Sequence, residues 1–212
     1  MSYFVTGGTG FIGRFLIDTL LRERGGTIYA LVREGSLPRL QQLIERWPDG
    51  EQRVVPVVGD LTQPLLGVDP AWLAKHTGKI AHYFHLAAIY DMTADDAFNQ
   101  RVNVEGTQNA IALANALEVG CLHHTSSVAA AGNYEGVFTE ALFAEGQPLP
   151  SPYHRTKYES EALVRETATV PWRVYRPAIV VGHSETGEMD KIDGPYYLFK
   201  TIQRLGGTLP SW

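Results

Sequence analysis

The sequence has few of the residues on which disulfide-bonded and membrane-spanning proteins depend. One of its 212 residues is a cysteine, Cys121, which excludes an internal disulfide framework and fits a reducing compartment. No apolar run approaches the length of a transmembrane helix, and Met1 leads directly into an apolar strand instead of a signal sequence. We therefore expect a cytoplasmic protein without a transmembrane segment.

The sequence also has no excess of positive charge and no obvious set of metal ligands. Its 18 Lys and Arg residues are outnumbered by 23 Asp and Glu residues, which gives a net charge of −5. This balance argues against a general nucleic-acid-binding protein. With one cysteine and no clustered histidine–carboxylate spacing, no metal site is expected. The sequence leaves open whether the protein forms a homo-oligomer.

Apolar segments alternate with helical segments along the whole chain. This alternation predicts βαβ units and an α/β fold with a doubly wound parallel sheet, the Rossmann fold. Pro56 places the third strand near an edge of the sheet. The predicted strands are 3–6, 27–32, 54–58, 80–86, 121–125 and 172–176, and the predicted helices are 11–24, 38–47, 71–77, 97–118, 153–166 and 195–205.

We assign residues 1–182 to one nucleotide-binding domain that carries the catalytic residues. Residues 183–212 are expected to begin a substrate-binding lobe. Because a trailing turn that ends at Trp212 is an unusual terminus, we interpret the chain as a fragment cut before the rest of that lobe.

The first strand ends in a glycine-rich turn that leads into a helix. Residues 8–13 fit the G-x-G-x-x-G spacing of dinucleotide-binding turns, and Gly7, Gly10 and Gly13 fit a second register with a glycine at every third position. Glycine allows positive φ and a close approach of the backbone to a ligand, while the helix N-terminus favours a diphosphate. The turn therefore predicts a dinucleotide site.

Two charged residues follow the second and third strands. Arg33 suits the 2′-phosphate of NADP, whereas an acid at this place would bind the ribose of NAD; the adjacent Glu34 leaves that assignment open to dispute. Asp60 has two interpretations, an acceptor for the adenine amino group or a cap for the following turn.

A second set of residues predicts proton transfer. Tyr153 and Lys157, four residues apart, lie on one helix face, where an ammonium lowers the pKa of a phenol and makes it a better proton donor at neutral pH. Ser127, after the fifth strand, is our choice for a second hydroxyl on the same substrate oxygen, with Ser126 as the alternative. His85, His123, His124 and Cys121 are expected to be structural, and Cys121 to be a buried core thiol.

Nearly the whole chain resembles the extended short-chain dehydrogenase/reductases. The motifs that carry this resemblance are Thr6-Gly7-Gly8-Thr9-Gly10-Phe11-Ile12-Gly13, Gly59-Asp60, His85-Leu86-Ala87-Ala88, Asn103-Val104-Glu105-Gly106-Thr107, Ser126-Ser127, residues 153–157 and Arg176-Pro177. Within that superfamily, Leu31-Val32-Arg33 and residues 182–190 look like the bacterial fatty acyl-CoA reductases, which are related to thioester-reducing domains and are longer than this chain.

The resemblance implies an NADPH-dependent oxidoreductase that reduces a fatty acyl-CoA or another acyl thioester to an aldehyde, and it leaves open whether the aldehyde is reduced again to an alcohol. It implies catalytic roles for Ser127, Tyr153 and Lys157. The cofactor-binding residues that it implies are Thr6, Gly7, Gly8, Thr9, Gly10, Phe11, Ile12, Gly13, Arg33, Asp60, Leu61, Ala87, Tyr153, Lys157 and Pro177.

Three alternatives stay open at this point. A sugar-nucleotide epimerase or dehydratase is disfavoured by Arg33 and by the apolar residues 128–130, where dehydratases carry acids. A hydroxysteroid-type dehydrogenase survives these tests better. A non-catalytic NADP-binding sensor would not need Ser127, Tyr153 and Lys157 together.

Overall fold

The computed structural model describes residues 1–88, 100–189 and 195–205. The chain divides into two compact units, residues 1–177 and 178–212. Each unit is described by itself. Residues 97–99 of a predicted helix, Asp190 of the 182–190 motif and the terminal residues 206–212 lie outside the described residues.

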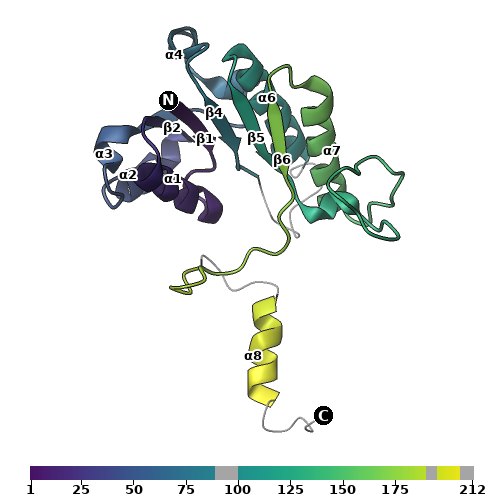
Figure 1. The fold of residues 1–212 in the computed structure, drawn as a ribbon. Helices are drawn as coiled ribbons and strands as arrows, with labels where there is room; N and C mark the ends of the chain where they lie inside the picture. The colour runs from purple at the N-terminus through teal and green to yellow at the C-terminus, as the bar shows by residue number, and fades with distance from the viewer. Residues whose placement is uncertain (89–99, 190–194, 206–212) are drawn as a thin grey trace. The chain divides into compact units, whose positions relative to one another are not determined.

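The first unit is built on a sheet of six parallel strands in the order β3-β2-β1-β4-β5-β6 (Figure 1). From β1 the chain adds β2 and β3 on one side, and it then crosses back to add β4, β5 and β6 on the other side. The strand order therefore reverses between β1 and β4. The edge position of β3 agrees with Pro56, which has no N–H to donate to a second neighbour. The strands are β1 Ser2–Thr6, β2 Thr27–Val32, β3 Val54–Val58, β4 His82–His85, β5 Cys121–Thr125 and β6 Trp172–Tyr175.

Helices cover both faces of this sheet (Figure 1). Because side chains alternate along a strand, Val5 and Ile28 pack with α1 and α2 on one face, while Phe4, Tyr83 and Leu122 pack with α4, α6 and α7 on the other. The helices of this unit are α1 Phe11–Glu23, α2 Leu37–Ile44, α3 Gly50–Arg53, α4 Pro70–His76, α6 Gly106–Ala116 and α7 Pro152–Thr167. A π-helical segment, Gln100–Glu105, precedes α6.

The predicted Rossmann fold is confirmed. The short helix α3 was not predicted, and the other differences lie at the ends of elements. The helix expected at 38–47 ends at Ile44, where a turn through Trp47 takes over. The described part of the helix expected at 97–118 begins as the π-helical segment. Cys121, expected in the core, is partly exposed because it opens β5.

The second unit contains a turn and one described helix, α8 Pro195–Leu205. The His183 ring nitrogen Nδ1 accepts from the backbone N–H groups of Glu185 and Thr186, and the Tyr196 hydroxyl accepts from the Gly182 N–H at 2.7 Å. These bonds order the turn that carries the described part of the 182–190 motif. None of the described helices in either unit has the length and apolar character that a bilayer-spanning segment requires.

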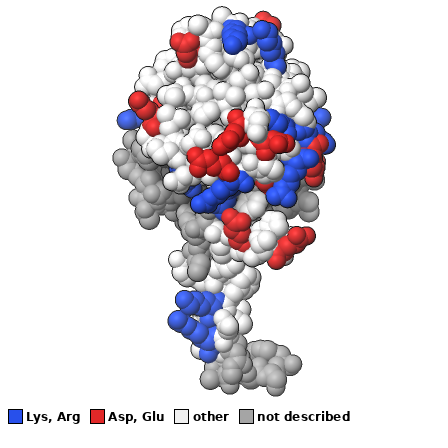
Figure 2. Space-filling view, turned by 90° about the vertical axis from the view of Figure 1, so that its left-hand side faces the viewer, with Lys and Arg blue, Asp and Glu red and all other residues white. Residues whose placement is uncertain are grey.

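Charged side chains are mixed by sign on the surface that can be seen in Figure 2. Among the described residues on that side of the first unit, acidic and basic groups alternate, and neither forms a broad patch.

Candidate functional site

The glycine turn connects β1 to α1 in a conformation that side chains would obstruct. Gly7 has φ +74°, and a Cβ there would lie 2.8 Å from the Ala87 backbone nitrogen. A Cβ on Gly13 would lie 2.1 Å from the Gly7 carbonyl oxygen. No side chain caps the N-terminus of α1 after Gly10. Only glycine therefore lets the backbone of the turn pack this closely, and no side chain competes for the first N–H groups of α1.

A cleft of about 370 Å³ opens at the carboxyl ends of β1, β2, β3 and β4. It lies at the point where the strand order reverses, which is where ligands bind in open α/β sheets. The predicted cofactor residues that line it are Gly7, Thr9, Gly10, Arg33, Asp60, Leu61 and Ala87; other lining residues are Leu31, Val32, Ser36, Gly59, Thr62, Leu86, Ala88 and Val102.

The two charged residues on this cleft have different surroundings. Arg33 is exposed and begins the short 3₁₀ turn Glu34–Ser36. Asp60 Oδ1 accepts from the backbone N–H and the hydroxyl of Thr62, both at 2.8 Å. The Thr62 backbone hydrogen bond, helped by the Thr62 hydroxyl and by Arg33, lowers the pKa of Asp60 although burial opposes this. Asp60 thus caps the following turn while it lines the cleft.

Helix α7 carries Tyr153 in its first turn and Lys157 in its second. Ser151 caps its N-terminus and Pro152 occupies its first position, which explains why the helix begins there. Lys157 is 7% exposed, and its Nζ donates to the Thr125 carbonyl at 3.4 Å. Burial lowers the pKa of Lys157 to about 8. Most Lys157 side chains are therefore still charged at pH 7.

The two serines after β5 are both buried but have different partners. Ser126 donates its hydroxyl hydrogen to the Glu161 carboxylate at 2.8 Å. Ser127 Oγ accepts from the Ala129 N–H at 3.1 Å, so its own hydrogen is not used by that bond. This difference favours Ser127 over Ser126 as a donor to a ligand.

The buried histidines are structural groups of the sheet. His85 Nδ1 lies 2.8 Å from the Thr6 hydroxyl, and its other ring nitrogen lies 3.3 Å from the Thr107 hydroxyl. Burial, with a smaller effect of Lys157, lowers the pKa of His85 to about 3. His123 bonds to Tyr175 and His82 on the opposite face. Burial, with smaller effects of His82 and Arg173, lowers the pKa of His123 to about 4, so the His85 and His123 rings are neutral at pH 7.

A profile of the male sterility protein family matches residues 5–212. This chain belongs to that family. The resemblance to the extended short-chain dehydrogenase/reductases is thereby confirmed, and the chain carries an NAD(P)-binding domain of their kind.

Most of this male sterility family chain aligns with individual relatives. A linear gramicidin synthase of Brevibacillus parabrevis is 33% identical over 95% of the chain, which spans 4% of that protein. A putative fatty acyl-CoA reductase of Drosophila melanogaster is 30% identical over 87% of the chain, which spans 42% of that protein. The solved terminal R domain from the myxalamid PKS-NRPS biosynthetic pathway superposes with a TM-score of 0.83 at 29% identity, over 96% of the chain and 55% of that domain. The chain thus spans little more than half, or less, of each.

Several predicted site residues of this male sterility family member lie away from the cleft lining. Thr6 is buried beneath the turn and binds His85, while Gly8 and Gly13 are buried and pack the turn against α1. Phe11 and Ile12 open α1. The Pro177 carbonyl accepts from the Val128 N–H, which joins the ends of β5 and β6.

Sequence patterns missed two polar residues of the cleft, Ser36 and Thr62, and one apolar residue, Val102. Ser36 and Thr62 each follow a strand by a few residues, in the same segments as Arg33 and Asp60. That placement was the available signal. Val102 is brought in by the π-helical segment, which no sequence pattern indicated.

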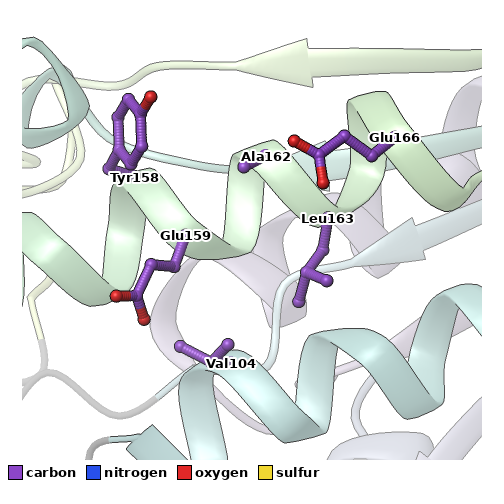
Figure 3. A pocket seen from close by; sticks show the side chains of 6 residues that line it. All are labelled: Val104, Tyr158, Glu159, Ala162, Leu163 and Glu166. Carbon is purple, nitrogen blue, oxygen red and sulfur yellow. The ribbon is translucent and has the colours of Figure 1, made fainter. Parts of the chain in front are cut away.

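Another hollow, of about 280 Å³, lies between α7 and the π-helical segment (Figure 3). It is lined by Val104, Tyr158, Glu159, Ala162, Leu163 and Glu166. Ser127, Tyr153 and Lys157 are among the lining residues of neither this hollow nor the cleft at the ends of β1–β4, and the two share no lining residue. Within residues 1–88, 100–189 and 195–205, no three His, Cys, Asp or Glu side chains gather as metal ligands.

Proposed function

We propose that this chain binds NADPH in the cleft at the ends of β1–β4 and reduces an acyl thioester to an aldehyde with Ser127, Tyr153 and Lys157. One observation carries the proposal: the unit that contains the glycine-lined cleft and Arg33 also contains a buried lysine, Lys157, one helical turn after Tyr153. Membership of the male sterility family and the two relatives named for synthase or reductase activity support it.

The residues present fit a dinucleotide. The close backbone packing that glycine permits at Gly7 and Gly13 shapes the turn, and the uncapped start of α1 suits a diphosphate. Arg33 supplies five N–H donors and a permanent positive charge, which suit a 2′-phosphate. Ser36 adds a hydroxyl to the same wall. We assign the diphosphate to the turn and the 2′-phosphate to Arg33.

When bound, the reduced nicotinamide supplies a hydride. The residues of this chain then handle charge and protons. Ser127 and Tyr153 donate hydrogen bonds to the thioester oxygen as negative charge develops on it, and Tyr153 transfers its proton there. The Lys157 ammonium favours the phenolate that remains on Tyr153.

The rest of the reaction follows from the chemistry of the product. The thiohemiacetal collapses, the carbon–sulfur bond breaks and a thiolate leaves, which gives an aldehyde. The balanced step consumes one thioester, one NADPH and one proton, and yields one aldehyde, one thiol and NADP⁺. Reduction of that aldehyde to an alcohol would use the same residues and a second NADPH.

The test is a substrate panel with the whole natural protein that carries this chain. NADPH absorbance is followed with decanoyl-CoA, the decanoyl thioester of N-acetylcysteamine, decanal, a UDP-sugar and a hydroxysteroid. We expect oxidation of NADPH with the thioesters and release of free thiol. Activity with the UDP-sugar or the hydroxysteroid alone would replace this function by one of the two alternative dehydrogenase functions. NADPH binding with no turnover of any compound would indicate a sensor.

The choice of NADPH over NADH has its own test. Removing one hydrogen-bonding charge costs about 1.5–3 kcal/mol, so Arg33→Ala should raise the KM for NADPH about 10- to 100-fold and leave that for NADH nearly unchanged. Arg22→Ala, an exposed helix residue paired with Asp18, is the matched control. Equal effects of Arg33→Ala on both cofactors would contradict the assignment.

A further inference from the structure

Glu161 is the only fully buried carboxylate among the described residues, and both of its oxygens are saturated with donors. Its Oε2 accepts from Ser126 Oγ at 2.8 Å and from Arg176 Nε at 3.0 Å. Its Oε1 accepts from the terminal NH2 group of Arg176 at 2.7 Å and from Arg165 Nε and NH2 at 2.9 and 2.8 Å. Three residues from three elements therefore converge on one buried charge.

The partners decide the charge of Glu161. Burial alone would raise the pKa of Glu161, but hydrogen bonds from Arg176, Ser126 and Arg165 outweigh burial and hold the pKa below its usual range. A buried ion pair with complete hydrogen bonding resists distortion, because moving one partner leaves a charge uncompensated. The Glu161 side chain is thus held rigidly by its hydrogen bonds.

Arg176 connects Glu161 to the loop that runs from the two serines to α7. It donates to the Leu142 carbonyl at 2.8 Å and to the Thr139 carbonyl at 3.4 Å. Its guanidinium also lies over the Phe138 ring, 5.1 Å from the ring centre. One arginine at the end of β6 therefore holds both α7 and residues 138–142.

Glu161 also stands in a particular relation to the proposed catalytic residues. Tyr153, Lys157 and Glu161 are spaced by four residues along α7, so they follow one another along one helix face. Ser126, which donates to Glu161, is the residue before Ser127. The same carboxylate is therefore tied to the helix that bears Tyr153 and Lys157 and to the strand end that bears Ser127.

We propose that Glu161 is a positioning residue, which through Ser126 and Arg176 fixes Ser127 relative to Tyr153 and Lys157. The proposal rests on the proposed function for its kinetic consequence. Its structural consequence, a rigid junction of β5, α7 and β6, holds whatever the substrate. A merely stabilising ion pair would instead affect all parts of the unit alike.

The experiment uses mild changes to the partners, since replacing Glu161 itself would leave Arg176 buried without a counter-charge. Ser126→Ala removes the bond to the strand end, and Arg176→Lys weakens the bonds to the loop. Arg165→Lys is the matched control, because Arg165 binds the same carboxylate from within α7 and its other contacts among the described residues are with the Phe143 and Trp172 rings, not with the end of β5. Melting temperature, NADPH Kd, kcat and amide hydrogen exchange are measured for each variant in the whole natural protein.

We expect Ser126→Ala and Arg176→Lys to lower kcat about tenfold or more while the NADPH Kd stays within about twofold, because small misplacements of catalytic groups are costly. Amide exchange at residues 126–129 should rise about fivefold in both variants. Arg165→Lys should lower the melting temperature without either change.

Two results would overturn the positioning role. One is a loss of kcat in all three variants in proportion to their melting temperatures. The other is unchanged exchange at residues 126–129 in Ser126→Ala. If the wild-type protein oxidises NADPH with no member of the substrate panel, the proposed function has failed, and the exchange comparison still decides whether Glu161 fixes this junction.

Discussion

The two halves of the sheet are buried in different ways. In the half formed by β1, β2 and β3 with α1 to α4, the buried polar residues among those described are Thr6 and His76, and the rest of the core is apolar. In the half formed by β4, β5 and β6 with α6 and α7, the buried polar residues include five histidine, lysine and glutamate side chains, namely His85, His123, His124, Lys157 and Glu161.

This difference separates two ways of building a site. In the proposed function, the β1–β3 half would bind the cofactor through the backbone of its glycine turn and its uncapped helix, with an apolar core beneath. The β4–β6 half would act through side chains with perturbed pKa values, which need partners and burial. Changes in the first half should therefore act on cofactor binding, and changes in the second on the rate of the chemical step.

The largest expected effect tests the second half. Tyr153→Phe removes the proton donor and should lower kcat about 10²- to 10⁴-fold, while the NADPH Kd measured by fluorescence stays the same. Tyr158→Phe makes the same change on the same helix, at a residue that lines the hollow of Figure 3, and should leave kcat unaffected. Retained turnover in Tyr153→Phe would remove Tyr153 from the mechanism and with it the distinction between the halves.

The next effect tests the first half. Gly13→Ala would place a Cβ 2.1 Å from the Gly7 carbonyl oxygen, so the turn must move, and we expect a loss of about 2–4 kcal/mol in the free energy of unfolding together with the loss of NADPH binding. Gly25→Ala is the control, because nothing lies within 4 Å of the Cβ it would add. Denaturant unfolding with and without NADPH measures both quantities. If Gly13→Ala binds NADPH normally, the backbone turn is not the binding element.

The sequence predicted the β1–β3 half of the site better than the β4–β6 half, for a physical reason. The glycine spacing of residues 7–13 is a local pattern, because the turn and the start of α1 are set by neighbours in sequence, and it predicted the turn correctly. Asp60 was left between two interpretations because its Thr62 hydrogen bonds and its place on the cleft depend on where the chain goes after β3.

The β4–β6 half depends on contacts between residues far apart in sequence. The spacing of Tyr153 and Lys157 was visible, but the burial that lowers the pKa of Lys157 comes from α7 packing on β5. Glu161 and Arg176 are 15 residues apart, and no spacing rule joins them across a helix and a strand. The hydrogen bond from Ser126 to Glu161 also favours Ser127 over Ser126 as a donor to a ligand, a preference that the sequence alone expressed without a contact.

A pH profile sharpens the account of Lys157. Its pKa in the folded protein is lowered to about 8 by burial, so its charge is present below that pH and is lost as the pH rises through it. The rate kcat/KM should fall about tenfold between pH 7 and pH 9. Lys157→Arg, which keeps its charge over this range, should move the fall to higher pH if it folds. A profile in Lys157→Arg identical to that of the wild type would assign the titration to another group.

The smallest expected effect compares two histidines that face each other in register on β4 and β5. His85 and His124 stack with ring centres 5.6 Å apart. Both ring nitrogens of His85 have hydroxyl partners, whereas in the described part of the chain neither nitrogen of His124 has one. An unpartnered buried polar group costs about 1–3 kcal/mol, so His124→Phe should leave the free energy of unfolding unchanged or raise it. His85→Phe should lower it, because it removes one hydrogen-bond partner from each of the Thr6 and Thr107 hydroxyls, which keep their bonds to the Ala87 N–H and the Asn103 carbonyl. Denaturant unfolding of both variants gives the comparison. Equal destabilisation would mean that His124 binds a partner of its own, and that this half contains one more buried polar contact than the hydrogen bonds of His85 and Glu161 account for.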